Sequence, residues 1–271
     1  MSLESIRTPQ EGDLLVPFER QNFPSEYKEY YQVKRRNLFA SIQGFGEMWK
    51  YYMDLDKIWL REFDDLENSP DPGRIFPLML FINAHAKIRI SIELAFSGCM
   101  SEARSILRDG VEFVAHAHAM LNDPSLQKVW LSKNEEEKAF ELAFEHHKKS
   151  GVFRGLEELH KVWGQLSDQG AHANLNAICD RFVVTKSDTE VQWRLKYSGL
   201  EEKVWATSLF PLLLTSFKME ERLFKDYETR LQFDEGLMRM RSDFERFKEK
   251  LRAILKVRYN VKLPAPLIVT L

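Results

Sequence analysis

Hydrophobic residues recur along most of this chain at intervals of three, four or seven positions, the spacing of a helix with one apolar face. The first such pattern covers residues 25–67 and predicts one helix with a kink at Gly44 and Gly46. The second begins near Ile75, with Pro77 in its first turn, and is apolar around its whole circumference. It predicts a central helix that is packed on every side.

Further helices are predicted wherever the helical spacing resumes after a proline, a glycine or a polar turn. They cover residues 101–121, 124–131, 134–149, 153–163, 200–229 and 237–254, and Pro211 is expected to kink or split one of them. Two β-rich runs around a four-residue polar link, at about residues 181–197, predict a small hairpin. The predicted fold class is therefore all-α, a multi-helix bundle with one small β-hairpin insertion.

The domain organisation follows from the same pattern. We expect an irregular N-terminal segment at 1–24, one helical-bundle domain at 25–258, and an extended C-terminal tail at 259–271. Of 271 residues, 44% are hydrophobic and 30% are charged, which are ordinary globular values and exclude a disordered or fibrous chain.

Charge and cysteine content limit the class of partner and the compartment. The net charge of −2, from 39 basic and 41 acidic residues, argues against general attraction to nucleic acid or anionic membranes. Two cysteines cannot form a disulfide framework, so a reducing compartment is expected. Without a signal-peptide pattern or an uninterrupted apolar span, we expect a soluble, cytoplasmic protein that does not bind membranes.

The second and third predicted helices each carry charged and imidazole side chains at four-residue spacing, so each set shares one helix face. The sets are His85, Arg89 and Glu93, and then Arg104, Arg108, Glu112 and His116. Consecutive helices with a short connection are antiparallel neighbours, so we expect one buried polar network between them. Buried charges must pair or hold a ligand, and both a structural network and a ligand site are compatible with this pattern.

A polar connector at residues 165–174 supplies further candidates for this polar core. Ser167, His172 and Asn174 lie there, where the chain turns back onto the predicted bundle. Arg108-x-x-x-Glu112, followed by Leu166-Ser167-x-x-x-x-His172-x-Asn174 and a hairpin, resembles a group of bacterial helical-bundle proteins that is similar to the HEPN superfamily. The resemblance covers roughly residues 35–255 and implies a helical bundle.

Some HEPN proteins are RNA-cleaving toxins that carry an arginine and, four to six residues later, a histidine on one helix. Arg154 and His160 have this spacing, although Gly155 replaces the polar residue that usually follows the arginine. The resemblance implies that His160 would act as general acid or base and that Arg154 would stabilise the phosphorane. Such sites in the superfamily usually assemble across a dimer.

The sequence thus favours a non-enzymatic interaction or ligand-sensing protein with a buried Arg/Glu/His network. Its site residues would be Arg89, Glu93, Arg108, Glu112, His116, Ser167 and His172. The alternative is a metal-independent endoribonuclease, or a toxin–antitoxin component, that uses Arg154 and His160. A homodimer and a protein partner are compatible with both functions, whereas RNA is a partner only under the alternative. No metal is expected, because Glu157-x-x-His160 has no second such pair. No cofactor is expected either, because the sequence has no Gly-rich phosphate-binding loop.

Overall fold

The computed structural model describes residues 24–67, 72–144, 151–171, 182–186, 191–195, 202–228 and 233–259. The side chains that it describes are those of 24–66, 73–144, 151–169, 205–228 and 233–258. Nine α-helices lie in this part of the chain and pack as a bundle, which confirms the all-α class. The predicted terminal segments, 1–24 and 259–271, lie almost entirely outside the described residues, so the domain limits stay a prediction.

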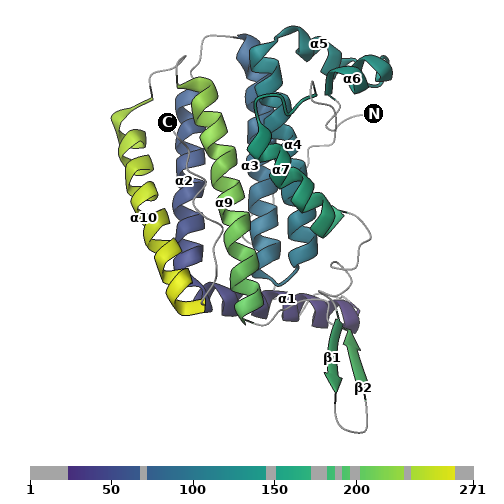
Figure 1. The fold of residues 1–271 in the computed structure, drawn as a ribbon, viewed down its shortest axis with the longest axis vertical. Coiled ribbons are helices and arrows are strands. Elements are labelled where there is room, and N and C mark those ends of the chain that lie inside the picture. Colours follow the sequence, from purple (N-terminus) through teal and green to yellow (C-terminus); the bar gives the residue numbers. More distant parts are fainter. Residues whose placement is uncertain are drawn as a thin grey trace.

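Five long helices form the body of the bundle and stand side by side (Figure 1). They are α2 (Gly46–Glu67), α3 (Ile75–Phe96), α4 (Met100–Asn122), α9 (Glu202–Tyr227) and α10 (Glu235–Tyr259). Helix α1 (Ser25–Gly44) crosses one end of the bundle, and α7 (Glu157–Leu166) lies across α4. The short helices α5 (Ser125–Leu131) and α6 (Glu137–Phe144) lie at the opposite end, and a 3-10 turn, η3 (Pro72–Arg74), precedes α3.

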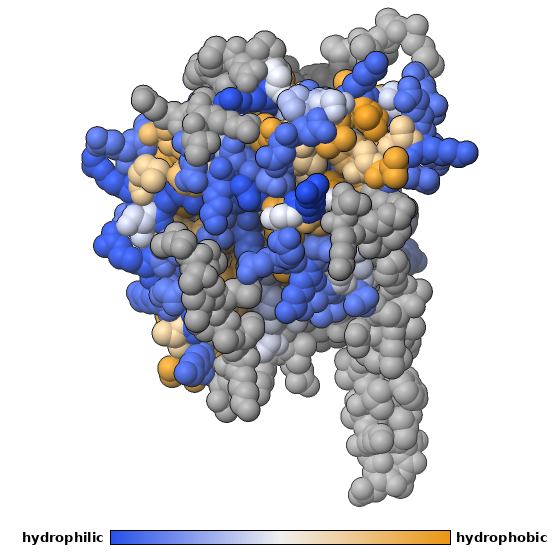
Figure 2. All heavy atoms as spheres, turned by 45° about the horizontal axis from the view of Figure 1, so that its top comes forward, coloured by the Kyte–Doolittle hydropathy of each residue, from blue (hydrophilic) through white to orange (hydrophobic). Residues whose placement is uncertain are grey.

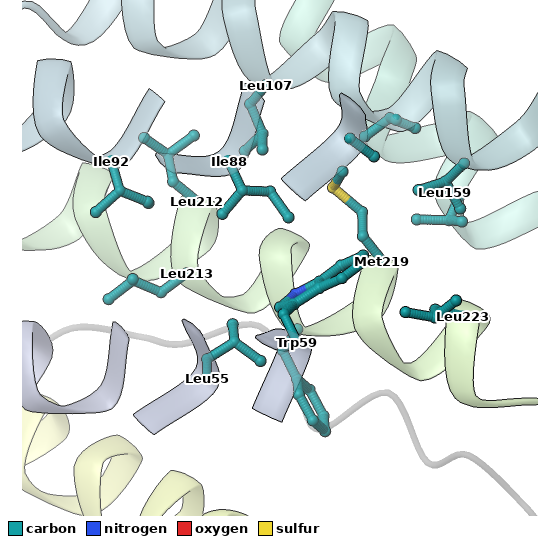
Figure 3. Packing of buried hydrophobic residues seen from close by; sticks show 14 of the residues in the cluster. Leu55, Trp59, Ile88, Ile92, Leu107, Leu159, Leu212, Leu213, Met219 and Leu223 are labelled. Atoms are coloured by element: carbon teal, nitrogen blue, oxygen red, sulfur yellow. The ribbon is translucent and has the colours of Figure 1, made fainter. Parts of the chain in front are cut away.

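One cluster of buried hydrophobic residues holds these helices together. Figure 3 shows how its side chains interlock between α2, α3, α4, α7 and α9, with Trp59 and Met219 near the middle. Gly110 lets α4 approach its neighbours, because a Cβ there would lie 3.0 Å from Met219 Cε and 3.3 Å from Lys87 Cβ. The cluster includes residues from Phe45 to Leu255, so widely separated parts of the chain share one core.

The predicted helix at 25–67 is two helices rather than one kinked helix. The chain turns at Phe45, whose side chain is buried and whose backbone is no longer helical. Ser41, in the last turn of α1, donates its hydroxyl hydrogen to the carbonyl oxygen of Phe96 at the end of α3. Burial of Phe45 and this bond hold α1 across the end of the bundle, where a continuous helix would run past it.

Helix α3 is not packed on every side, contrary to the prediction. Its residues facing α4 and α9 are fully buried, but Ile75, Met79, Ile82 and Ile90 are exposed. Among the described helices, α3 is the one long and apolar enough to span a membrane, although 44% of its most apolar window is buried inside the bundle. A core helix of a soluble protein passes the same test of length and composition.

Two other element boundaries differ from the predictions. The helix expected at 153–163 begins only at Glu157, because Gly155, with φ +77°, closes a turn before it, and Gly164 lies inside α7. Helix α9 continues through Pro211 without being split. The helix expected at 134–149 begins only at Glu137, as α6, and residues 145–149 lie outside the described residues.

The predicted hairpin falls on two short strands. β1 (Phe182–Lys186) and β2 (Val191–Leu195) pair antiparallel, with Phe182 opposite Leu195 and Lys186 opposite Val191. The residues that link and flank these strands lie outside the described part, so an insertion seated on the helical body stays a prediction.

The face of the molecule shown in Figure 2 is mainly polar, with smaller apolar patches. Figure 2 shows polar residues over most of one face and apolar residues gathered where α5 and α6 lie. Leu131 of α5 and Leu142 of α6 are both largely exposed.

Candidate functional site

The polar residues predicted from the sequence form several separate clusters, not one network. On α3, His85 and Arg89 turn toward α2 and share Asp56. His85 Nε2 lies 2.7 Å from Asp56 Oδ1, and Arg89 donates to both carboxylate oxygens at 2.7 and 2.8 Å. The ring of Trp59 stacks on His85 with centroids 5.3 Å apart. Asp56 was not among the predicted residues, and it is the centre of this cluster.

The charge on Asp56 is stabilised by its two partners. Burial disfavours the ionised carboxylate, but the hydrogen bonds from His85 and Arg89 outweigh burial and hold the pKa of Asp56 well below its usual range. The bond to Asp56 also raises the pKa of Arg89. Glu93, the other predicted residue of this stripe, is exposed and pairs with Lys34 of α1 at 3.4 Å. Glu93 therefore lies apart from the cluster around Asp56, and its place in a ligand site stays a prediction.

On α4, Arg108 connects helix α4 with helix α7 and the turn that follows it. Arg108 Nε donates to Ser167 Oγ at 2.9 Å, and NH2 donates to Glu112 Oε1 at 3.1 Å. The guanidinium lies over the indole ring of Trp163, 4.8 Å from its centroid, and Trp163 Nε1 donates to Glu112 Oε1 at 3.0 Å. These four residues and Asp109, which accepts a bond from Arg108 NH1 at 3.3 Å, are called here the Arg108 cluster.

Local sequence explains how α7 brings its residues to Arg108. Leu159 and Leu166 are buried against the bundle, which turns the intervening Trp163 toward α4. Ser167 begins a five-residue π-helix, η4 (Ser167–Ala171), and its hydroxyl donates to the carbonyl oxygen of Trp163 at 2.9 Å. π-Helical turns are uncommon and are frequent at functional sites. Three predicted site residues, Arg108, Glu112 and Ser167, thus do lie together.

The other predicted members of the α4 stripe contact different neighbours. His116 accepts a hydrogen bond at Nδ1 from Trp130 Nε1 at 3.1 Å and lies against Phe144, so it belongs to the contact of α4 with α5 and α6. Arg104 lies 3.3 Å from Ser208 Oγ on α9. His172 and Asn174 lie outside the described residues, so their place in the site stays a prediction.

The residues of the alternative nuclease do not share a helix. Arg154 is exposed in the turn before α7, whereas His160 lies on α7 with its ring stacked on Phe153 at 4.7 Å. The spacing that suggested the pair assumes one helix for both residues, and that assumption is wrong. A ribonuclease or toxin–antitoxin role at these residues stays a prediction.

Two further ion-pair clusters were missed by sequence reasoning. Arg241 of α10 pairs with Glu62 of α2, NH1 to Oε1 at 3.0 Å, and also with Glu220 of α9; both glutamates have no exposed surface. Asp226 of α9 accepts a bond from His118 Nδ1 at 2.9 Å. One signal was available for the first cluster, because Glu62 occupies a position of the apolar stripe of α2.

Burial dominates the ionisation of Glu62. It raises the pKa of Glu62 to about 8, because desolvation of the carboxylate outweighs the attraction of Arg241. The two glutamates and one arginine therefore need not carry two negative charges at neutral pH. The described part of the chain is thus a helical body with several buried or half-buried salt-bridge networks.

Comparisons with models of known protein families, with curated proteins and with solved structures find no match to this chain. The HEPN resemblance consequently rests on the short motifs alone. Among the described residues, no group of three or more His, Cys, Asp or Glu side chains is placed to hold a metal ion.

Proposed function

We propose that this protein is a non-enzymatic ligand-sensing and interaction protein, and that the Arg108 cluster is its ligand site. The observation that carries the proposal is the position of Arg108, whose half-buried guanidinium joins α4 to the first residue of the π-helix and stacks on Trp163. The ligand class is a small molecule with a carboxylate or phosphate group, since a guanidinium binds these oxyanions with paired hydrogen bonds.

Arg108 has the donors and the access that an oxyanion needs. Its bonds to Ser167, Asp109 and Glu112 use three of the five N–H groups of the guanidinium. The side chain keeps 21% of its surface exposed, so part of it is open to solvent. A charge in this position is only partly hydrated, which strengthens its attraction for an anion relative to that of a fully exposed arginine.

Glu112 is the group that an oxyanion would displace. If a ligand replaces it at Arg108, Glu112 keeps the hydrogen bond from Trp163 Nε1, and its side chain is 22% exposed to water. Asp109 lies 3.7 Å from Lys87 Nζ, so its charge is balanced by a second cation. Binding thus exchanges the Glu112 carboxylate for the oxyanion of the ligand at Arg108, without leaving a buried charge unpaired.

The signal of binding would be a change at the π-helix. Arg108 holds Ser167 through one hydrogen bond, and Ser167 in turn bonds to the carbonyl oxygen of Trp163. A ligand that draws the guanidinium away from Ser167 loosens the start of η4, whereas one that bridges both residues tightens it. Either change can alter how residues after 167 are presented to a partner, which links sensing to interaction.

The test compares thermal unfolding in inorganic phosphate, acetate and chloride at equal ionic strength. A ligand that binds only the folded protein raises the melting temperature with concentration. We expect a rise in phosphate or acetate for the wild type, no site-specific rise for Arg108→Gln, and a larger one for Glu112→Gln, which removes the competing charge. The two anions distinguish a phosphate site from a carboxylate site.

Arg239→Gln is the matched control, because Arg239 forms a similar i,i+4 pair with Glu235 on an exposed face. It should respond to the anions as the wild type does, since phosphate stabilises many proteins without binding a site. Equal shifts in Arg108→Gln and wild type would contradict the proposal.

A further inference from the structure

The large aromatic side chains that are exposed in the described part of the chain all lie on one helix. They are Tyr27, Tyr30, Tyr31 and Phe39 of α1, which crosses one end of the bundle (Figure 1). The other large hydrophobic residues that are exposed in the described part are aliphatic residues or methionines. Aromatic rings stack on other planar rings, so α1 presents a different kind of surface from the rest of this part.

Three consecutive cations, Lys34, Arg35 and Arg36, lie among these rings. Lys34 pairs with Glu93 of α3 at 3.4 Å. Arg35 and Arg36 are exposed, and neither forms an ion pair with a described side chain. Arg35 instead lies over the ring of Phe39, 5.7 Å from its centroid. Two exposed arginines of α10, by contrast, each pair with a carboxylate on their own helix. The charges of Arg35 and Arg36 are thus available to an anion.

These cations and two of the rings line one groove, called here the α1 groove. It lies between α1 and the C-terminal end of α3, has a volume of about 700 Å³, and is lined by residues that include Tyr31, Arg35, Arg36, Phe39 and Glu93. This volume is within the usual range for sites that bind small molecules. Phe39 follows Arg36 by three residues and Arg35 by four, so both guanidinium groups are neighbours of its ring on the helix surface.

We propose that the α1 groove binds a nucleotide with two or three phosphates. The base stacks on Phe39, which is 57% exposed, and the phosphates bind Arg35, Arg36 and Lys34. A base stacks favourably on an aromatic face, and a guanidinium binds phosphate oxygens with paired hydrogen bonds. The inference is independent of the proposed ligand site, since no residue of the Arg108 cluster lines the α1 groove.

The distribution of charge along α1 favours one nucleotide over a nucleic acid strand. The three cations of the groove lie within a single helical turn. The first two turns of α1 carry Glu26 and Glu29, which would repel a phosphate backbone that continued along the helix, and one cation, Lys28. A polyphosphate, whose charge is concentrated at one place, therefore fits this helix better than a strand does.

The packing of α1 disfavours a lipid surface, the other occupant that a helix with cations and apolar rings suggests. Binding to a membrane requires an apolar helix face that can enter the acyl-chain region. Leu38 and Ile42, two aliphatic residues of α1, pack against the core of the bundle. The exposed apolar side chains of α1 are therefore aromatic, which favours a planar ring over acyl chains.

Glu93 should limit the affinity for the nucleotide. It lines the α1 groove and pairs with Lys34, so a phosphate competes with its carboxylate for this cation and is repelled by its charge. Glu93→Gln should consequently bind the nucleotide several-fold more tightly than the wild type. Weaker binding by this variant would place the phosphates away from Lys34 and contradict the proposed arrangement.

The first test measures ATP binding by isothermal titration calorimetry at constant ionic strength. Arg36→Gln should weaken binding about tenfold, because a hydrogen bond between charged groups is lost. Lys28→Gln is the matched control, since it removes a cation of the same helix that does not line the groove, and it should bind ATP as the wild type does. No binding of millimolar ATP by the wild type, or equal weakening by both substitutions, would overturn the proposal.

The second test separates the base from the phosphates by comparing ATP with inorganic triphosphate. Phe39→Leu should weaken ATP binding about tenfold, through the loss of stacking, and leave triphosphate binding unchanged. Tyr27→Leu replaces another exposed ring of α1, which does not line the groove, and should change neither. Unchanged ATP binding by Phe39→Leu would refute the nucleotide.

Three further results would assign the binding elsewhere and overturn the proposal. Loss of ATP binding in Arg108→Gln but not in Arg36→Gln would place the phosphates at the Arg108 cluster. Tighter binding of a short oligo(dT) strand than of ATP, weakened by both Phe39→Leu and Tyr27→Leu, would indicate a nucleic acid site. Co-sedimentation with phosphatidylserine vesicles that Arg36→Gln abolishes would assign the face to a membrane.

Discussion

Glu62 provides the strongest test of the buried networks, because it is a glutamate with no exposed surface in the centre of the bundle. Its Oε1 accepts a hydrogen bond from Arg241, which also pairs with the buried Glu220. Burial raises the pKa of Glu62 from 4.5 to about 8, so the folded protein holds a proton there that the unfolded chain releases at neutral pH. The free energy of unfolding therefore depends on pH through Glu62, and we predict that Glu62→Gln removes this dependence.

The sign and size of this pH dependence follow from proton linkage. Because the folded pKa lies above the unfolded one, folding binds a proton between about pH 4.5 and pH 8, and stability falls as the pH rises through this window. The slope is about 1.4 kcal/mol per pH unit where the two states differ by a full proton. Between pH 5 and pH 8, Glu62 should thus lower the free energy of unfolding of the wild type by about 3 kcal/mol.

Glutamine is a suitable replacement, because its side-chain oxygen can accept the same bond from Arg241 and it has no charge at any pH. The assay is urea unfolding followed by circular dichroism at pH 5, 6, 7 and 8. The free energy of Glu62→Gln minus that of the wild type should rise by about 3 kcal/mol from pH 5 to pH 8. The exposed Glu235→Gln serves as control and should give a constant difference.

Parallel pH curves for Glu62→Gln and the wild type would refute the reasoning. They would mean that Glu62 is ionised throughout this range and that Arg241 fully compensates its burial. A loss of stability on substitution that is equal at all four pH values would have the same meaning.

Three further predictions concern other parts of the bundle. Asp56→Asn should lower the free energy of unfolding at pH 7 by about 2 kcal/mol and flatten the decline of that free energy below pH 4. The lowered pKa of Asp56 stabilises the fold at pH values above the pKa of the unfolded chain, and this gain is lost as the pH falls. Urea melts at pH 7 and pH 3 measure both effects, and an equal loss of stability between these pH values in variant and wild type would contradict them. Gly110→Val should lower the melting temperature, because even a Cβ at this position would lie 3.0 Å from Met219 Cε. Gly164→Ala is the control and should raise the melting temperature slightly, because its Cβ would meet nothing within 4 Å. A higher melting temperature for Gly110→Val would show that the helices can separate. Mixed RNA should show no cleavage that depends on His160, since its predicted arginine partner lies outside α7; cleavage by the wild type that His160→Ala abolishes would establish the nuclease instead.

Much of the fold could be predicted from the sequence, because helix formation depends on local spacing. The period of apolar residues located the long helices α3, α4 and α10 to within a few positions. Boundaries were less accurate where a residue acts through its surroundings. Phe45 ends α1 because its side chain is drawn into the core, and Gly155 delays α7 through its backbone conformation. Neither effect is visible in a pattern of polar and apolar residues.

The candidate site was predicted in part. Arg108 and Glu112 could be paired from their i,i+4 spacing, and Ser167 was singled out by the polar connector around it. The connector did not indicate Trp163, whose role comes from stacking on a guanidinium contributed by another helix. The expectation of one network between α3 and α4 was wrong because helix periodicity fixes which residues share a face, and says nothing about which neighbour that face meets.

The sequence by itself thus determined that the chain forms long helices with apolar faces, and which charged residues lie together on each helix. Only the tertiary structure decided the partners of those charges: Asp56 for His85 and Arg89, and Arg241 for Glu62, which is 179 positions away. The physical reason is a difference of range. Helical spacing arises from bonds and contacts within a few residues, whereas the pairing of buried charges depends on how whole helices pack, which is set by the complete core.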